Sequence, residues 1–475
     1  QQPHCGYCET GLSCRNCIMG PCRVDPFGEG PQQGVCGADA DIIVARNLAR
    51  MIAAGAASHS DHGRDLVEVL LKVAEGKAAG YSIKDPAKLR SVAAEYGLAA
   101  DGKDDLTLAG ELADAMQEDY GTRKSSVTLL SRAPEKRRAV WEKAGIVPRG
   151  IDRETSEAMH RTHMGVDNDW VSILLHAMRN ALSDGWGGSM IATDVSDILF
   201  GVPQPNKSTA NIGVLQNDKV NIVVHGHNPV VSETVVAACN APQLLKLAED
   251  KGANGINLVG VCCTGNELMM RHGLPMAGNH LMTELVLVTG AVEMMIVDYQ
   301  CIMPSIGQTA ACYHTKMIST SEKAKFPGME HHEFSPKNAY QKAEELVKTA
   351  VENFSRRNKN RVSIPAVQPQ EVVSGLSVEA VINALGGTPD PLIDAIKAGK
   401  IRGAVGVVGC NNPKIKHDYG HTQLTTQLIA NDILVLDTGC VSMAHAKAGF
   451  KTVEALEQAG PGLKEVCGAL GIPPV

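Results

Sequence analysis

The sequence predicts an α/β protein with a mostly α-helical N-terminal domain and two Rossmann-like, doubly wound parallel-sheet domains, the second of them incomplete. Two observations predict this class. Ala-rich segments with apolar residues three and four apart fill the chain up to about residue 200. Beyond it, short Val- and Ile-rich runs alternate with helix-like segments, as βαβ units require. We place the domains at residues 1–205, 206–371 and 372–475.

The three predicted domains follow from local pattern. In the first, helical periodicity is broken only by polar, glycine-containing stretches such as "YGLAADGKDD" and "KAGIVPRGID". In the second, the strand-like runs "VNIVV", "INLVGV" and "VEMMIV" are separated by helical segments, among them "GNHLMTELVLVTG". The Pro-rich stretch "VSIPAVQPQEV" closes this domain, and the runs "AVGVVG" and "DILVLD" start the strands of the third.

Composition excludes several classes of function. The 475 residues carry a net charge of -7 without long single-sign runs, which disfavours a nucleic-acid partner. No apolar run approaches the ~20 residues of a membrane span. No secretory signal is visible, so we expect a cytoplasmic protein. Fourteen cysteines in such a chain favour metal sites over disulfides.

A cysteine array near the start predicts an iron–sulfur cluster. Cys14, Cys17, Cys22 and Cys36 follow the spacing C-x2-C-x4-C-x13-C. A structural zinc site is the alternative, but zinc sites usually pair two C-x2-C knuckles a dozen or more residues apart. A compact trio followed by a fourth cysteine is more typical of a 4Fe–4S cluster.

Cys5 and Cys8 form a second C-x2-C pair just upstream. Two thiolates do not complete a cluster. We therefore expect a second copy of the chain to supply the other two, which would make a homodimer bridged by a shared cluster.

Soft or borderline metal ligands follow five predicted strands. Ligands of open α/β sheets bind where strands finish, so we expect these residues to meet at one polynuclear metal centre between two α/β domains. Of His225 and His227, the second is the better ligand because it lies past the strand. Of Cys262 and Cys263, we expect only one to bind metal. The remaining ligands expected at strand ends are Cys301, Cys410 and Cys440.

A row of titratable side chains recurs every third residue from His59 through His62 and Asp65 to Glu68. On a helix these side chains would share one face. The row fits either a solvated polar face or a proton path, and the expected redox centre favours the proton path.

Together these motifs resemble the nickel–iron carbon monoxide dehydrogenase family over the whole chain. The segments that carry the resemblance are "GLSCRNCIMGPCRVD", "HGHNPVVSE", "GVCCTGNE", "DYQCIMPS", "VVGCNNPK" and "DTGC". It implies oxidation of CO and water to CO2, two protons and two electrons, or the reverse. Electrons would leave through iron–sulfur clusters to ferredoxin, and acetyl-CoA synthase is a further candidate partner.

The resemblance assigns roles residue by residue. It implies that His227 and Cys263 bind iron, and that Cys301, Cys410 and Cys440 hold the rest of the nickel–iron–sulfur C cluster. The 4Fe–4S B cluster falls to the array of Cys14, Cys17, Cys22 and Cys36, and the bridging D cluster to Cys5 and Cys8. His59 matches the catalytic histidine, His62 the next member of the proton path, and Asp184 an assisting carboxylate.

Three departures from the family pattern stand out. Many members have a D-cluster cysteine where this chain has Ser13, so a bridging cluster on Cys5 and Cys8 is either 4Fe–4S or 2Fe–2S. Later proton-path positions are Asp65 and Glu68, where histidine is frequent. In family sequences, the segment after "GIPPV" leads into a nickel-binding cysteine and later a catalytic lysine. Neither is present, so we expect the chain to be incomplete.

Two other functions compete with this hypothesis. A hybrid-cluster protein that reduces hydroxylamine shares the general plan, but its site mixes carboxylates with Cys and His ligands. A non-catalytic electron-transfer subunit would fit if the chain truly ended at Val475. A dinucleotide enzyme is disfavoured because no G-x-G-x-x-G follows a predicted strand.

Overall fold

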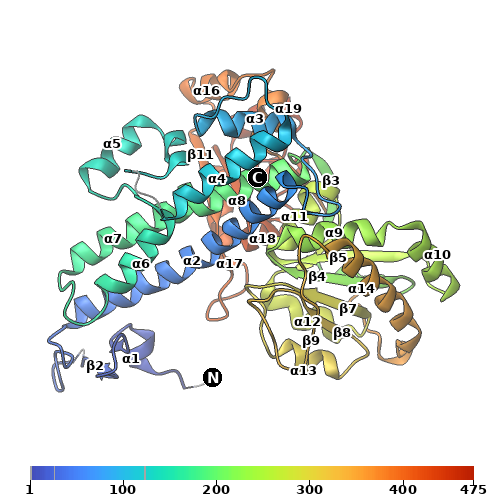
Figure 1. Cartoon of the computed structure of the whole chain (residues 1–475), viewed down its shortest axis with the longest axis horizontal. Coiled ribbons are helices and arrows are strands. Elements are labelled where there is room, and N and C mark those ends of the chain that lie inside the picture. The colour runs from blue at the N-terminus through green and yellow to red at the C-terminus, as the bar shows by residue number, and fades with distance from the viewer. Residues whose placement is uncertain (1–2, 26, 122–124) are drawn as a thin grey trace. The chain divides into compact units, whose positions relative to one another are not determined.

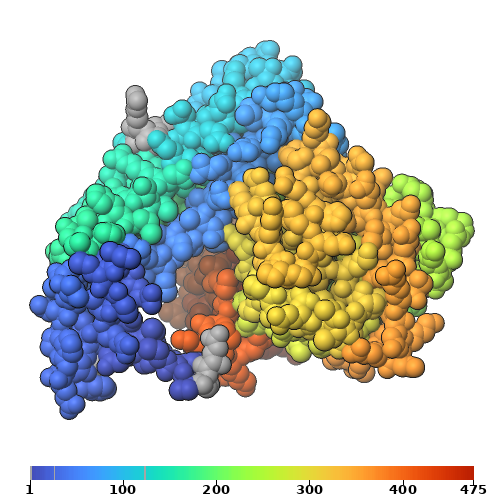
Figure 2. All heavy atoms as spheres, turned by 60° about the horizontal axis from the view of Figure 1, so that its bottom comes forward, coloured from blue at the N-terminus to red at the C-terminus, as the bar shows by residue number. Residues whose placement is uncertain are grey.

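The computed structural model describes residues 3–25, 27–121 and 125–475 and divides into two compact units (Figure 1). Unit 1 is Gln1–Phe200 and unit 2 is Gly201–Val475; Figure 2 colours unit 1 blue to blue-green and unit 2 green to red. Helices make up unit 1 and a parallel-dominated sheet organises unit 2, which confirms the α/β class. The three-domain division stays a prediction, and residues 370–374, at its second boundary, form a strand.

Unit 1 is built around one long helix, α2. The helices of unit 1 are α1 (Gly6–Glu9), α2 (Ala40–Ala74), α3 (Pro86–Glu95), α4 (Asp105–Gly121), α5 (Glu135–Lys143), α6 (Ile151–Arg161), α7 (Trp170–Ser183) and α8 (Ser189–Phe200). Two short strands, β1 (Ser13–Cys14) and β2 (Cys22–Arg23), pair antiparallel before α2. Across residues 3–25, 27–121 and 125–475, no helix combines the length and apolar character that crossing a membrane requires.

Helix α2 begins where Asp39 caps it, accepting a hydrogen bond from the backbone N–H of Ile42 at 3.0 Å. It packs against α4, α6, α7 and α8. The middle of its buried stripe is made of small side chains, including Ala49, Ala53 and Ala56, with larger Ile, Leu and Val side chains toward both ends. Small residues let neighbouring helices approach α2 closely. The predicted proton-path residues His59 and His62 lie on this helix.

Unit 2 alternates strands with helices. Its strands are β3 (Asn206–Ala210), β4 (Val220–Gly226), β5 (Ile256–Val261), β6 (Met276–Gly278), β7 (Val292–Val297), β8 (Lys316–Ser319), β9 (Glu330–His331), β10 (Gln370–Ser374), β11 (Gly403–Val408) and β12 (Ile433–Thr438). Its helices are α9 (Pro229–Cys239), α10 (Pro242–Asp250), α11 (Cys262–His272), α12 (Thr283–Val288), α13 (Ile306–Ala311), α14 (Ala339–Asn353), α15 (Val378–Ala384), α16 (Asp390–Lys397), α17 (Tyr419–Ala430), α18 (Cys440–Lys447) and α19 (Pro461–Leu470).

The main sheet has eight strands in the order β10-β3-β6-β5-β4-β7-β8-β9. All of its pairs are parallel except β10 with β3. β4, β5 and β7 are almost entirely buried, as expected for a parallel sheet covered on both faces.

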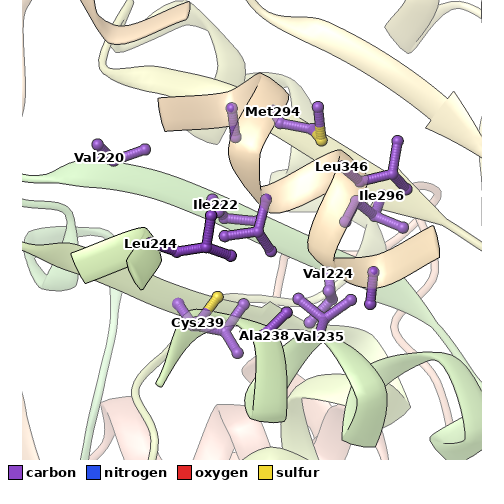
Figure 3. Packing of buried hydrophobic residues seen from close by; sticks show 14 of the residues in the cluster. Val220, Ile222, Val224, Val235, Ala238, Cys239, Leu244, Met294, Ile296 and Leu346 are labelled. Atoms are coloured by element: carbon purple, nitrogen blue, oxygen red, sulfur yellow. The ribbon is translucent and has the colours of Figure 1, made fainter. Parts of the chain in front are cut away.

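Side-chain alternation along β4 separates the two hydrophobic cores of the sheet. Val220, Ile222 and Val224 belong to the core formed with the helices α9, α10 and α14, and Figure 3 shows Val224 beside Val235 and Leu346 beside Ile296. Val223, which lies between Ile222 and Val224, faces the opposite core, which includes residues of α12 and α13. Helices therefore pack on both faces of the strands that lead to the predicted metal ligands.

The second sheet of unit 2 consists of the parallel pair β11 and β12, in register from Gly403 with Ile433 to Val408 with Thr438. Its core includes Val407, Ile429 of α17 and Val441 of α18. Both strands end at the same edge, because they are parallel, and each is followed two residues later by a predicted cysteine ligand.

Candidate metal centre

Three neighbouring strands of the main sheet deliver ligands at one edge. β4 ends at Gly226 and is followed by His227, β5 ends directly before Cys262, and Cys301 lies four residues after β7. These strands are adjacent and parallel in the order β5-β4-β7. Their carboxyl ends therefore share one edge of the sheet, as the sequence predicted.

The cysteines that follow β11 and β12 join this group. Cys440 is the first residue of α18, and its Sγ lies 3.7 Å from Nδ1 of His280. The Cys440 thiol also hydrogen-bonds with Cys410 and Cys262. The second sheet thus contributes both of its predicted thiols to the same place.

The thiols form a continuous set of contacts. Cys262 hydrogen-bonds with Cys301 and with Cys440. His227 hydrogen-bonds through its side chain with Cys263 and Cys301, with 4.0 Å between its Nε2 and the Cys301 Sγ. All five residues predicted as C-cluster ligands are therefore brought together, which is what a single polynuclear centre requires.

Two residues at this centre were missed by sequence reasoning. The Sγ atoms of Cys262 and Cys301 and a ring nitrogen of His280 all lie within 4.8 Å of one another. The sequence predicts one metal ligand in the pair Cys262 and Cys263, and the family resemblance assigns that role to Cys263. His280 follows the short strand β6, which neighbours β5, but this segment was expected to be wholly helical. Recognising "PMAG" as a strand would have identified His280 as another ligand candidate.

Asp298 holds the loop that presents His227. Its carboxylate accepts the backbone N–H of His227 at 2.8 Å and that of Asn228 at 3.0 Å. Gly226, at φ +142°, allows the close approach, because a Cβ there would overlap the Asp298 carboxylate. The His227 Nδ1 faces the backbone carbonyl of Tyr299 at 3.3 Å, which leaves Nε2 toward the thiols.

The backbone at the centre adopts conformations that side chains disfavour. Cys262, Gln300 and Cys301 have φ values of 63°, 60° and 60°, in the left-handed region. Such conformations cost about 1–3 kcal/mol each and cluster at functional sites. The strained residues lie where the thiols of Cys262 and Cys301 contact each other.

The electrostatics act differently on the four thiols: the pKa values of Cys301 and Cys440 are lowered, whereas the hydrogen bond with Cys440 raises the pKa of Cys410 and burial raises that of Cys262. The hydrogen bond with Cys262 lowers the pKa of Cys301 to about 5, and the same thiol lowers the pKa of Cys440. Burial lowers the pKa of His227, but the thiols of Cys263 and Cys301 outweigh burial and raise it to about 11. Depressed thiol pKa values are typical of metal-binding cysteines.

His225 is buried near the end of β4, two residues before His227. Burial lowers its pKa to about 3, so the ring is neutral. The donor set, mostly sulfur with imidazole, fits a nickel–iron–sulfur cluster.

The four cysteines of the N-terminal array converge within unit 1. Cys14, Cys17, Cys22 and Cys36 line one small pocket, together with Arg46 of α2. Cys14 and Cys22 are paired across the β1–β2 hairpin. The arrangement suits a 4Fe–4S cluster, which four thiolates hold.

The upstream pair is placed at the surface of unit 1. Cys5 precedes α1 at its N-cap and Cys8 lies within α1, and both are exposed. Hydrogen bonds with Cys8 lower the pKa of the Cys5 thiol. Two exposed, neighbouring thiols are arranged as half of a shared site would be.

The predicted proton-path residues lie along α2, and His59 pairs with Asp184. The His59 Nδ1 lies 3.0 Å from Asp184 Oδ2, and the Ser189 hydroxyl donates to the other oxygen at 2.9 Å. Asp184 begins a π-helical turn, Asp184–Gly188, and such turns are frequent at functional sites. Asp184 therefore contacts the predicted catalytic histidine directly, and its role in the reaction stays a prediction.

A second group of possible ligands, Glu154, Glu157 and His176, lies between α6 and α7. Its carboxylates accept hydrogen bonds from Arg149, and Arg179 donates to both at 2.8 Å and 2.9 Å. Guanidinium groups occupy the oxygens that a metal ion would need. This group is a buried charge network that joins two helices.

Comparison with known proteins gives full-length matches. The sequence profile of the Prismane/CO dehydrogenase family matches residues 12–475. Carbon monoxide dehydrogenase 1 of Methanosarcina mazei is 58% identical over 475 residues, which are 100% of this chain and 76% of that protein.

Two solved structures share the fold. A nickel-free carbon monoxide dehydrogenase from Thermococcus sp. AM4 is 55% identical with a TM-score of 0.97, covering 100% of this chain and 75% of that one. A chain of a solved acetyl-CoA synthase/carbon monoxide dehydrogenase, an assembly whose alpha subunits are described with NiZn[Fe4S4] and NiNi[Fe4S4] clusters, matches with 41% identity and a TM-score of 0.95, covering 100% of this chain and 73% of that one.

Proposed function

We propose, on the premise that this chain belongs to the Prismane/CO dehydrogenase family, that it interconverts CO and water with CO2, two protons and two electrons at a nickel–iron–sulfur cluster. The enzyme class expected from the sequence, an anaerobic carbon monoxide dehydrogenase, is confirmed by full-length relatives of that name. The same relatives favour this function over a hydroxylamine-reducing hybrid-cluster protein and over a non-catalytic subunit.

One observation carries the proposal. Thiols that follow four different strands meet one another and His227 at a single point of unit 2. A tetrahedral ion needs only four ligands, whereas this point offers more sulfur and imidazole ligands than that. When bound, the cluster supplies a site for CO, activates water and takes up the two electrons.

The chain's own residues would hold the cluster and move protons. We assign His227, Cys263, Cys301, Cys410 and Cys440 as its ligands. His227 is oriented by the Asp298 loop and the Tyr299 carbonyl, so its Nε2 is free to bind metal.

His59 accepts the released proton in this scheme. A carboxylate on its Nδ1 fixes the tautomer and makes Nε2 the basic atom. His62, three residues further along α2, would receive the proton next. Asp184 acts by holding and polarising the His59 ring.

Electrons would leave through unit 1. The pocket lined by Cys14, Cys17, Cys22 and Cys36 holds the 4Fe–4S B cluster, and the exposed Cys5 and Cys8 hold half of a bridging D cluster, 4Fe–4S or 2Fe–2S. A ferredoxin is the proposed acceptor. A related solved assembly joins acetyl-CoA synthase to carbon monoxide dehydrogenase, so that enzyme is a candidate partner.

A homodimer and a reducing compartment complete the proposal. An apolar strip on α2 and α7, formed by Val44, Leu48 and Met51 with Leu175 and Met178, is exposed. It adjoins the segment with Cys5 and Cys8, because Asn47 of α2 donates to the Gly11 and Ser13 carbonyls.

All 14 cysteines are free thiols, which fits the cytoplasm.

The test is CO-dependent reduction of a viologen dye by the anaerobically purified protein. His227→Ala should lower the turnover at least ~100-fold, since removing a ligand outweighs the 10–100-fold effect of losing a ligand's supporting partner. The B-cluster spectroscopic signal should remain. His272→Ala is the matched control, because His272 pairs with Glu233 elsewhere in unit 2 and should tolerate replacement.

Two results would overturn the assignment. Wild-type protein that is loaded with nickel and iron but inert toward CO would exclude the proposed reaction. Full activity of His227→Ala would remove that residue from the site.

A further inference from the structure

Arg46 places a buried positive charge against the N-terminal cysteine array. It lies on α2, and only 1% of its surface is exposed. Its Nη1 donates toward the Cys36 Sγ at 3.8 Å, and its side chain lines the pocket of the four thiols. No role for this residue follows from the ligand set.

The other contacts of Arg46 are neutral. Its Nη2 donates to the Asp167 backbone carbonyl at 2.9 Å and to the Asn168 Oδ1 at 2.8 Å. Its Nε has no hydrogen-bond partner, and the Asp167 carboxylate is engaged by Arg161 at 2.8 Å. Among the residues that the structure describes, Arg46 forms no ion pair with a carboxylate.

A buried guanidinium without a counter-charge is expensive, and proteins normally pair such groups. A guanidinium carries a permanent positive charge in proteins. Within the part of the chain that the structure describes, the acidic groups that Arg46 itself contacts are the cysteine thiols, through Cys36. A four-thiolate iron–sulfur cluster is itself an anion, and it becomes one charge more negative when it gains an electron. The charge of Arg46 therefore stabilises the reduced form more than the oxidised form.

We propose that Arg46 is the counter-cation of the B cluster and raises its reduction potential, so that the cluster accepts electrons readily from the active centre. The inference rests on the proposed function, which places a 4Fe–4S cluster on Cys14, Cys17, Cys22 and Cys36. The cluster takes up one electron, and no proton is needed because the compensating charge is permanent. Arg46 is a positioning residue, since it touches a ligand and not the substrate.

The experiment is a redox titration of the anaerobic full-length protein followed by electron paramagnetic resonance. The B-cluster signal is identified as the one that a Cys17→Ala variant loses. Arg46→Met keeps the length and apolar stem but removes the charge. It should lower the equilibrium constant for one-electron reduction at least tenfold, which is 59 mV, with the iron content unchanged. Arg46→Lys keeps the charge and should recover most of that loss.

Arg50→Met is the matched control. Arg50 lies one turn further along α2 and donates to the Thr162 hydroxyl at 2.9 Å, away from the thiols. Its replacement should leave the midpoint unchanged. An unchanged midpoint in an Arg46→Met protein that retains the B-cluster signal would overturn the inference.

A second variant covers the case in which Arg46→Met does not assemble the cluster. Asn168 is exposed, and Asn168→Asp places a carboxylate next to Nη2 without removing the arginine. Partial neutralisation should lower the potential by less than Arg46→Met does, and an unchanged potential would again overturn the inference. If the Cys17→Ala variant keeps every signal that the wild type shows, the B cluster itself is refuted.

Discussion

Gly226 and Asp298 show how single residues shape the metal centre. The carboxylate of Asp298 occupies the space that a side chain at 226 would fill, and from there it accepts two backbone N–H groups of the His227 loop. The left-handed backbone at Cys262 and Cys301 then turns both thiols toward the same point. Contacts that a sequence motif does not display therefore position the predicted ligands.

Gly226→Ala tests this arrangement. The new Cβ must displace the Asp298 carboxylate and also adopt φ +142°, so we expect a loss of about 3 kcal/mol in the free energy of unfolding. Denaturant unfolding followed by circular dichroism measures it. Gly252→Ala is the control, because Gly252 has φ +83° with no atom within 4 Å of the added Cβ, and about 1 kcal/mol is expected there. Equal losses in the two variants would contradict the role of Asp298.

Individual ligands were predictable where the residue type itself is informative. Cys301, Cys410 and Cys440 stood out because thiols recur directly after strand-like runs. His280 did not, because it follows a three-residue strand whose pattern cannot be told from the start of a helix. Asp298 was invisible for a different reason: it acts through backbone N–H groups that only the folded loop brings to it.

At the scale of elements, a network of charged side chains joins α6 to α7 in unit 1. Glu157 accepts hydrogen bonds from Arg161 and Arg179 at 2.9 Å each. Burial alone would raise the pKa of Glu157, but these hydrogen bonds and that with Arg149 lower it to about 2. The pKa of Glu154 is lowered in the same way, against the opposing effect of burial.

The lowered pKa values predict how unit 1 responds to acid. A carboxylate whose folded pKa is depressed stabilises the fold above its unfolded pKa of about 4.3, and this contribution is lost as the pH falls toward the folded pKa. Stability should therefore decline from about pH 5 toward pH 2.

Glu157→Gln should flatten that decline, and Glu135→Gln, an exposed position on α5, should not. All three tryptophans, Trp141, Trp170 and Trp186, lie in unit 1, so tryptophan fluorescence during urea unfolding reports on this unit. The same pH slope in wild type and Glu157→Gln would contradict the prediction.

Helices and apolar buried strands were predicted well, and the two polar strands at one end of the main sheet poorly. The breaks at residues 96–105 and 143–152 separate α3 from α4 and α5 from α6 as expected. β4, β5 and β7 have continuous apolar runs that mark buried strands. β3 and β10 do not, since "NKSTA" and "QEVVS" are mostly polar and pair only across the long stretch of chain from 211 to 369. Their pairing depends on tertiary contacts that local pattern does not encode.

At the scale of the whole molecule, the exposed strip on α2 and α7 predicts self-association. Leu48 is 42% exposed and Met51 65%, on the same helix that supports the cysteine-rich segment. Covering such a strip with a second copy would bring two Cys5/Cys8 pairs together and complete the bridging site.

Leu48→Glu should convert the dimer to monomers, because it buries a charge in the apolar interface. Sedimentation velocity of the anaerobic protein measures this. Leu285→Glu, at an exposed leucine of α12 in unit 2, is the control and should remain dimeric. A dimeric Leu48→Glu protein would exclude this face as the interface.

Metal content shows whether the soft ligands at the strand ends of unit 2 hold one cluster. Wild type purified anaerobically should contain about one nickel per chain together with the iron of its clusters. Cys301→Ala should lose the nickel and part of the iron, whereas Cys312→Ala, an exposed thiol outside the centre, should keep both. Unchanged nickel and iron in Cys301→Ala would contradict the account.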